Sequence, residues 1–320
     1  MSSALHLPTL KQLRYLVELD RHQHFGQAAE ACFVTQSTLS NGIQELENLL
    51  GVKLVERTKR TVFMTSLGRE IAERSRSLLY QAEDIARLAQ HQNTPLSGPF
   101  RLGVIPTIAP YLLPSALPLL RQNYPDLQLF LQEDETARLL DKLNAGEIDA
   151  ALMAFPYETK GVEWIELGRD PFWLACPRSH PLAGESAIEL EELFKSEGWT
   201  ETLILMEEGH CLREHSMAAC QLGSTPASQR NPKALRASSL LTLVHMIAGG
   251  LGISLLPALA CHSGLLQGAD ISLRPLNDPK GFRILGLAWR KGFTRKNDAK
   301  LLAETLRTTT QQLSGKGETA

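Results

Sequence analysis

Along the first 50 residues, apolar side chains recur every three or four positions, in short runs separated by turns. This spacing predicts three helices, over residues 10–19, 25–31 and 35–50, with a turn at 32–34. Residues 53–65 alternate between apolar and polar instead, which predicts a β-hairpin, and Gly51 is suited to ending the helix before it. Three short helices followed by a hairpin are typical of a winged helix-turn-helix, a fold that binds DNA.

The third helix has the features of a recognition helix. Its first turns carry a capping residue and small polar side chains, which can approach base edges in the major groove. We expect the DNA-reading residues to be Thr35, Gln36, Ser37, Ser40 and Asn41. We expect the hairpin to reach phosphates or the minor groove through Arg57, Lys59 and Arg60. The alternative for these three residues is a charged turn exposed to solvent.

The segment 66–91 predicts a long amphipathic helix that begins at a Ser66 cap. Its apolar residues follow steps of three, four or seven, from Leu67 to Ile85 and beyond. So narrow a seam cannot build a core alone, and it suits pairing with a second copy of the chain. Residues 93–99 are rich in Pro and include Gly and Ser, as linkers are.

From residue 100 onward, strand-like runs alternate with helical runs, which predicts βαβ units and a parallel sheet. Two such sets predict two lobes with a cleft between them, and the last strand and helix are expected to return to the first lobe. The predicted fold class is therefore α/β with an N-terminal DNA-binding domain. The expected domains are a winged helix-turn-helix at 1–65, a dimerisation helix at 66–92, a linker at 93–99, a regulatory domain at 100–312 and a tail at 313–320. Lobe I is expected at 100–167 and 271–312, and lobe II at 168–270.

Composition adds limits on location and on cofactors. The 320 residues are 43% hydrophobic and 21% charged with a net charge of −2, but residues 53–76 hold seven basic and three acidic side chains, a local net charge of +4. Charged residues and Pro8 interrupt the N-terminal segment, and glycines interrupt the longest uncharged run. We therefore expect a cytoplasmic protein with no membrane span. The sequence has no convincing metal-ligand set, so no metal or other cofactor is expected.

Two cysteines, Cys211 and Cys220, lie nine residues apart in a segment predicted to be helical from about residue 212 to 222. Nine helical steps rotate by about 900° and rise by about 13 Å, whereas a disulfide needs Cα atoms within about 7 Å. A disulfide would therefore require part of the helix to unwind. His210, Arg213 and a helix N-terminus favour a Cys211 thiolate, while two preceding glutamates oppose it. Spacing alone leaves open that the two thiols are unrelated.

The N-terminal motifs resemble the DNA-binding domain of LysR-type transcriptional regulators. They are FGQAAE at 25–30, VTQSTLS at 34–40, Leu46 with Glu47, LGV at 50–52, ERT at 56–58, Thr65 and Gly68. LNAGEIDAAL at 143–152 and GGLGISLLP at 249–257 extend the resemblance over nearly the whole chain. The family implies a two-lobed regulatory domain like periplasmic solute-binding proteins, and homodimers that pair into homotetramers. The recognition helix departs from the family pattern at Ser37, Gly42 and Gln44, so we expect a different operator.

A second set of motifs resembles the members of this family that sense hydrogen peroxide. The set comprises GHCLR at 209–213 with Cys220, IPT at 105–107, PYLLP at 110–114 and LLPALA at 255–260. The resemblance implies that Cys211 is the peroxidatic thiol and Cys220 its resolving partner. It also implies that peroxide is bound by Thr107, Thr136, His210 and Arg213, with Arg290 close by. Cys32, Cys176 and Cys261 are expected to have no redox role.

The sequence therefore predicts a regulator of oxidative-stress genes that is not an enzyme and is switched by a reversible Cys211–Cys220 disulfide. Its expected partners are promoter DNA, hydrogen peroxide, RNA polymerase and cellular thiol reductants. A regulator of the same family that responds to a small metabolite between the lobes is a rival interpretation. A thiol peroxidase is disfavoured by the DNA-binding domain, and an exported solute-binding protein would leave residues 1–91 unexplained.

Overall fold

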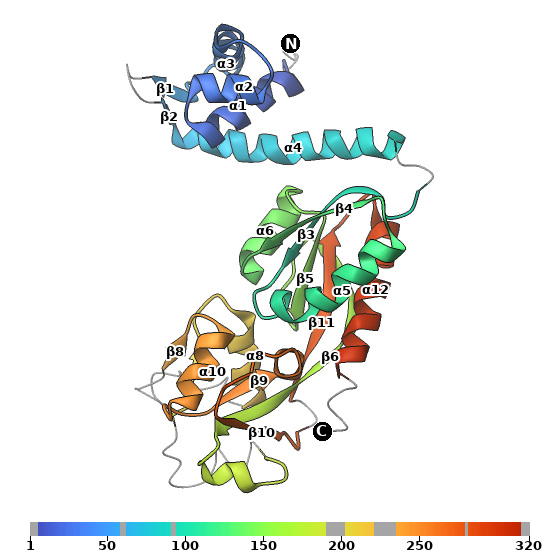
Figure 1. Ribbon diagram of the computed structural model, residues 1–320. Helices are drawn as coiled ribbons and strands as arrows, with labels where there is room; N and C mark the ends of the chain where they lie inside the picture. Colours follow the sequence, from blue (N-terminus) through green and yellow to red (C-terminus); the bar gives the residue numbers. More distant parts are fainter. Residues whose placement is uncertain are drawn as a thin grey trace. The chain divides into compact units, whose positions relative to one another are not determined.

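The computed structural model describes residues 6–57, 62–90, 94–189, 202–220, 235–278 and 281–314 (Figure 1). The chain forms two compact units, and the boundary along the sequence falls between Asn93 and Thr94. Within these described ranges, no helix combines the length and the apolar character needed to cross a membrane.

The N-terminal unit has the predicted order of helices and hairpin. Its elements are α1 (Leu10–His22), α2 (Phe25–Ala31), α3 (Gln36–Leu50), β1 (Val55–Arg57), β2 (Val62–Met64) and α4 (Ser66–Gln90). Each of the three short helices is capped by a side chain that accepts a hydrogen bond from a backbone N–H of the first turn. The capping residues of α1, α2 and α3 are Thr9, His24 and Thr35. Gly51 ends α3 with a φ of 68°, a conformation that suits glycine. These local signals account for the accuracy of the predicted boundaries.

The start of α4 differs from the prediction, because the cap is Thr65 and not Ser66. The Thr65 hydroxyl accepts a hydrogen bond from the Gly68 N–H at 2.9 Å and lies 3.1 Å from the Lys53 carbonyl, to which it donates. A Cβ at Gly68 would lie 2.1 Å from the Leu54 carbonyl oxygen, so the close approach of helix and wing requires glycine. Leu78 and Ile85 of the α4 seam are 50% and 69% exposed. Pairing of this seam with a second copy stays a prediction.

The C-terminal unit is built on one seven-stranded sheet in the order β10-β6-β11-β5-β3-β4, with β9 paired to β6. The strands are β3 (Gly98–Val104), β4 (Leu127–Glu133), β5 (Ala150–Phe155), β6 (Val162–Pro177), β9 (Ser254–Pro257), β10 (Ile271–Pro275) and β11 (Phe282–Arg290). β3 pairs in parallel with β4 and β5, as predicted, but β6, β9, β10 and β11 pair antiparallel. The parallel βαβ arrangement predicted for the strands of residues 100–155 is therefore confirmed, whereas the later strands join the sheet in the antiparallel direction.

Two lobes share this sheet, and the long strand β6 contributes side chains to the cores of both of them (Figure 1). The first lobe adds α5 (Ala109–Asn123), α6 (Thr136–Ala145) and α12 (Lys296–Ser314). The second adds a 3₁₀ turn (Pro181–Gly184), β7 (Leu205–Met206), α8 (Cys211–Ala219), β8 (Arg236–Ala237), α10 (Leu240–Ala248) and α11 (Ala258–Cys261). Each lobe has its own hydrophobic core. β10, which the sequence assigned to lobe I, pairs with the end of β6 and contributes Ile271 to the second core. The predicted α/β fold class is confirmed.

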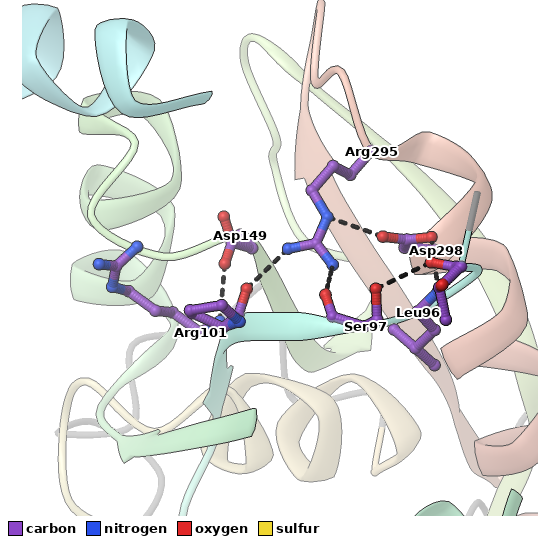
Figure 2. Close-up of polar contacts among 8 residues, drawn as sticks. Leu96, Ser97, Arg101, Asp149, Arg295 and Asp298 are labelled. Atoms are coloured by element: carbon purple, nitrogen blue, oxygen red, sulfur yellow. Dashed lines mark hydrogen bonds and ion pairs between the residues drawn. The ribbon is translucent and has the colours of Figure 1, made fainter. Parts of the chain in front are cut away.

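A polar clamp fixes the segment where the chain enters the first lobe (Figure 2). Arg295 donates hydrogen bonds to the carbonyls of Ser97 at 2.8 Å and Pro99 at 2.6 Å, and its guanidinium pairs with Asp298 at 2.7 Å. Asp298 in turn accepts the Leu96 N–H at 2.9 Å. These bonds satisfy backbone groups just before and at the start of β3, and they tie this segment to the residues at the start of α12.

Candidate functional site

Three turns that are far apart in the sequence meet around Cys211. They are the loop after β3 with Ile105, Pro106 and Thr107, the start of α6 with Glu135 and Thr136, and the start of α8 with Gly209 and His210. They form the walls of a narrow hollow beside the Cys211 thiol. We call this hollow the Cys211 pocket.

Cys211 is the first residue of α8 and is only 3% exposed. Burial raises the pKa of its thiol, while Arg283, the Thr136 hydroxyl and a backbone hydrogen bond from Ala154 lower it; the net direction is upward. The cation that acts on the thiol is therefore Arg283, not the His210 and Arg213 side chains that the sequence suggested. The reduced protein holds Cys211 mainly as a protonated thiol.

Arg283 is a site residue that the sequence analysis missed. Its side chain is fully buried and pairs with Asp170 at 2.9 Å, while Asp170 also accepts the Leu259 N–H at 2.8 Å. Arg283 donates to the Thr107 hydroxyl at 2.7 Å and to the Thr107 carbonyl at 3.0 Å. Asp170 and these hydrogen bonds compensate the buried charge. The available signal was an arginine near the start of a strand whose interior is otherwise apolar.

Thr107, Thr136 and His210 are brought together in the Cys211 pocket, where the family resemblance placed them. Thr107 and Thr136 are 2% and 1% exposed. The Thr136 hydroxyl has no hydrogen-bond partner of good geometry among the described residues, although it lies close enough to Cys211 to lower the pKa of the thiol. It is therefore available to a small ligand with a donor or an acceptor. Their role in peroxide binding stays a prediction.

Arg213 and Arg290 do not line the pocket. Arg213 directs its guanidinium to the Met206 carbonyl, at 3.4 Å. Arg290 lies over the ring of Phe293 at the far end of β11. At about 3.3 Å per residue, roughly 23 Å of strand separates it from Arg283. The expectation that Arg290 lies close to Cys211 is wrong, and Arg283 occupies that place.

Cys220 follows the last residue of α8 and is buried in the second core. Both cysteines are free thiols. Burial raises the pKa of Cys220 to about 12. Cys211 begins the nine-residue helix α8 and Cys220 follows its end, so the structure is that of the reduced chain with α8 wound. Disulfide formation between them stays a prediction.

Gly209 shapes the wall of the pocket. Its φ of 101° lies in the region that favours glycine, and an added Cβ would lie 2.6 Å from a Glu135 carboxylate oxygen. The turn before Cys211 therefore allows the start of α6 to approach α8 closely.

The predicted DNA-reading residues lie at the start of α3. Thr35 caps the helix by accepting the Thr38 N–H at 3.2 Å. Gln36, Ser37 and Asn41 are exposed, and Ser40 is half-buried. Arg57 ends β1, whereas Lys59 and Arg60 lie outside the described residues. Base and phosphate contacts by these residues stay predictions.

Gly42, a departure from the family pattern, has a structural reason. A Cβ at this buried position would lie 2.6 Å from the Tyr15 ring, so the glycine makes room for α1 to pack on α3. Its cost to helix stability is offset by the burial of Tyr15, which is 3% exposed.

The three remaining cysteines do not line the Cys211 pocket. Cys176 and Cys261 are buried in the second core, and Cys32 is half-buried in the N-terminal unit. Burial raises the pKa of all three thiols, which disfavours the reactive thiolate. Their expected lack of a redox role stays a prediction.

Comparison with known proteins assigns the family. Residues 10–69 match the bacterial regulatory helix-turn-helix proteins of the lysR family, and residues 93–311 match the LysR substrate binding domain. The chain belongs to the LysR family. As a LysR-type regulator, it combines a DNA-binding head with a two-lobed domain.

Among LysR-type relatives, EstR, an HTH-type transcriptional regulator of Acinetobacter baylyi, is 38% identical over 96% of this chain and 99% of its own length. The hydrogen peroxide-inducible genes activator of Escherichia coli O157:H7 is 37% identical over 93% of this chain and 94% of its own. A solved structure of full-length OxyR from Pseudomonas aeruginosa, a Cys-to-Asp variant, is similar with a TM-score of 0.74 and 38% identity, covering 94% of this chain and 95% of that one. The chain is thus an OxyR-like member of a family of transcriptional regulators, which are not enzymes.

Proposed function

We propose that this protein is a peroxide-sensing transcriptional regulator of oxidative-stress genes, switched by a reversible disulfide between Cys211 and Cys220. Overall identity does not choose between the EstR and peroxide-activator relatives, which differ by one percentage point. The observation that carries the proposal is the Cys211 pocket itself. A thiol at a helix N-terminus faces a small space lined by two buried threonines, with a buried arginine within electrostatic range.

The proposed reaction has two steps and consumes one peroxide. In the first, the Cys211 thiolate attacks one peroxide oxygen, the O–O bond breaks, and a sulfenic acid and a hydroxide form. In the second, the Cys220 thiol attacks the sulfenic sulfur, an S–S bond forms, and water leaves. The sulfurs are oxidised and peroxide is reduced. Thr107, Thr136 and His210 hold the peroxide, and Arg283 stabilises both the thiolate and the departing hydroxide.

Arg283 and the Thr136 hydroxyl matter because the resting thiol is mainly protonated. They increase the small thiolate fraction against the opposing effect of burial. The reaction is stoichiometric, since the protein stays oxidised until cellular thiol reductants restore it. This separates the proposed sensor from a thiol peroxidase.

The DNA-binding part of the proposal follows the domain division expected from the sequence. Residues 1–65 bind promoter DNA, the helix of 66–92 forms the dimer, 93–99 link it to the regulatory domain of 100–312, and 313–320 are a tail. Homodimers pair into a homotetramer that contacts RNA polymerase in the cytoplasm. Unwinding of α8 would change the packing of the lobes, and hence the spacing of the DNA-binding heads.

The test is to select binding sites from fragmented genomic DNA with the purified protein, and then to footprint the reduced and peroxide-treated forms on the selected sites. We expect both forms to bind and the protected length to differ between them, with Cys211→Ser fixed in the reduced pattern. Identical footprints before and after oxidation would instead favour the metabolite-responsive regulator.

A further inference from the structure

A second side chain of α8 reaches into the first lobe. His215 lies one helical turn after Cys211, and its Nε2 is 2.9 Å from the Pro156 carbonyl oxygen. Because a carbonyl only accepts, Nε2 carries the hydrogen and donates it. The side chain is 6% exposed, and its other nitrogen, Nδ1, has no hydrogen-bond partner among the described residues. The ring is therefore held by Pro156 on one side and by packing on the other.

This hydrogen bond spans the two lobes at the helix that the proposed switch must unwind. Cys211 belongs to the core of the first lobe, whereas Leu212, Ala219 and Cys220 belong to the core of the second. Pro156 directly follows β5 of the first lobe. His215 and Cys211 are thus held to the first lobe from the same helix, one turn apart.

We propose that His215 is a positioning residue that latches α8 to the first lobe through its hydrogen bond to Pro156, and that breaking this bond limits the rate at which oxidised Cys211 reaches Cys220. The latch rests on the proposed disulfide switch and adds a residue that sets its speed. The step that the latch slows is the condensation of the Cys211 sulfenic acid with the Cys220 thiol, which forms the S–S bond and releases water.

The charges around His215 make this step sensitive to pH. Burial and the positive charge of Arg283 lower the pKa of His215, while the hydrogen bond to Pro156 acts in the opposite direction. The charged and titratable groups on the surrounding elements are Arg283 of β11 with its partner Asp170 of β6, Tyr157 after β5, Asp141 of α6, and Cys211 and Glu214 of α8 itself.

The sign of the pH effect follows from this lowered pKa. The neutral ring stabilises the latched packing above about pH 6.5, the ordinary histidine value. Below that value a free histidine ring becomes protonated, but the packed His215 ring resists protonation because it is buried and Arg283 is also positive. Protonation therefore favours states in which α8 has left its packed position. Acid therefore loosens the latch. Lower pH also reduces the thiolate fraction of Cys220, which slows disulfide formation. Loosening of the latch and loss of thiolate therefore change the rate of disulfide formation in opposite directions.

The experiment separates the two chemical steps in the full-length protein. In a Cys220→Ser background, sulfenic acid at Cys211 is trapped with dimedone and its formation rate is measured by mass spectrometry. With Cys220 present, quenched samples give the rate of disulfide formation. The variants are His215→Leu, which cannot donate a hydrogen bond, and His215→Gln, which keeps an N–H donor but does not titrate. His245→Leu, on the exposed face of α10, is the matched control.

We expect His215→Leu to leave sulfenic acid formation within about twofold of wild type and to speed disulfide formation on the order of fivefold, which is the effect of one hydrogen bond. His215→Gln should restore the wild-type rate at about pH 7.5. Between about pH 7.5 and pH 5.5, disulfide formation should slow more steeply in His215→Gln than in wild type, by roughly threefold or more. His245→Leu should match wild type throughout.

Equal disulfide rates in wild type and His215→Leu would overturn the latch, and so would a loss of sulfenic acid formation in His215→Leu. If His215→Leu does not fold, the pH profiles of wild type and His215→Gln decide, and parallel profiles overturn the proposal. If no sulfenic acid forms at Cys211 in any variant, both the proposed function and the latch are rejected. Sulfenic acid that forms normally with no effect of His215 rejects the latch alone.

Discussion

Cys211 begins α8 and Cys220 directly follows its last residue, yet the two side chains are buried in different hydrophobic cores. Each lobe of the regulatory domain thus holds one member of the proposed redox pair. Because protein cores are close-packed, a disulfide between them must remove at least one side chain from its core. Oxidation of the two sulfur atoms can therefore change the packing of both lobes.

The first prediction concerns Arg283. We expect Arg283→Met to slow sulfenic acid formation at Cys211 by about 10- to 100-fold, because it removes the cation that favours the thiolate and the charge that stabilises leaving hydroxide. The variant also leaves Asp170 buried without its partner, so unfolding should become easier by about 3–5 kcal/mol. Stopped-flow peroxide kinetics and thermal melts measure the two effects.

Arg290→Met is the matched control, since Arg290 lies on the same strand but outside the Cys211 pocket. It should react with peroxide at the wild-type rate. A large loss of rate in Arg290→Met, with little loss in Arg283→Met, would show that the site has been assigned to the wrong arginine.

The second prediction is a pH dependence of Cys211. Because burial raises the pKa of the thiol, the thiolate fraction and the alkylation rate of the Cys211 peptide should still be increasing at pH 9, by about tenfold for each unit at lower pH. Thr136→Val removes a hydroxyl that lowers this pKa and should move the midpoint further upward. Rates that level off below about pH 8 would contradict the assigned burial effect.

The third prediction concerns the turn before Cys211. Gly209→Ala places a methyl group against Glu135 and forces alanine into a φ of 101°, so we expect a loss of about 1–3 kcal/mol in unfolding free energy. Gly184→Ala is the control, because its Cβ would meet no atom within 4 Å. Denaturant unfolding of the two variants checks the difference. Equal stabilities would mean that the turn relaxes freely.

The fourth prediction concerns the recognition helix. Gln36 is exposed on the first turn of α3, so Gln36→Ala should weaken binding to the selected operator by about 1–3 kcal/mol and relax the preference for one base pair. Non-specific DNA affinity should stay unchanged. Gln90→Ala, at the end of α4, serves as the control. A uniform loss on all DNA sequences would indicate a backbone contact instead.

The sequence predicted the parts of the fold that local chemistry determines. Thr35 as a cap and Gly51 as an end of α3 are local signals, and so is the period of the apolar residues in α1 and α4. The direction of β11 is not local, because it depends on the path of the chain between the two lobes. The pairing of β10 with the second lobe was missed for the same reason.

In the candidate site, too, some residues could be predicted from the sequence and others only from the fold. Thr107, Thr136 and His210 were found through the family resemblance, but no spacing rule joins positions that lie 29 and 74 residues apart along the chain. Arg283 could be recognised only after folding placed it between Thr107 and Asp170. The family resemblance implied Arg290 instead, which lies at the other end of the same strand.

The measurement that tests the central claim most directly is the mass of the purified reduced protein after brief exposure to micromolar peroxide, with peptide mapping of its five thiols. We predict a loss of two hydrogens that maps to a cross-link between Cys211 and Cys220. Cys220→Ser should instead gain one oxygen at Cys211, and Cys211→Ser should keep its original mass. Survival of all five thiols, or a cross-link that excludes Cys211, would contradict the redox switch.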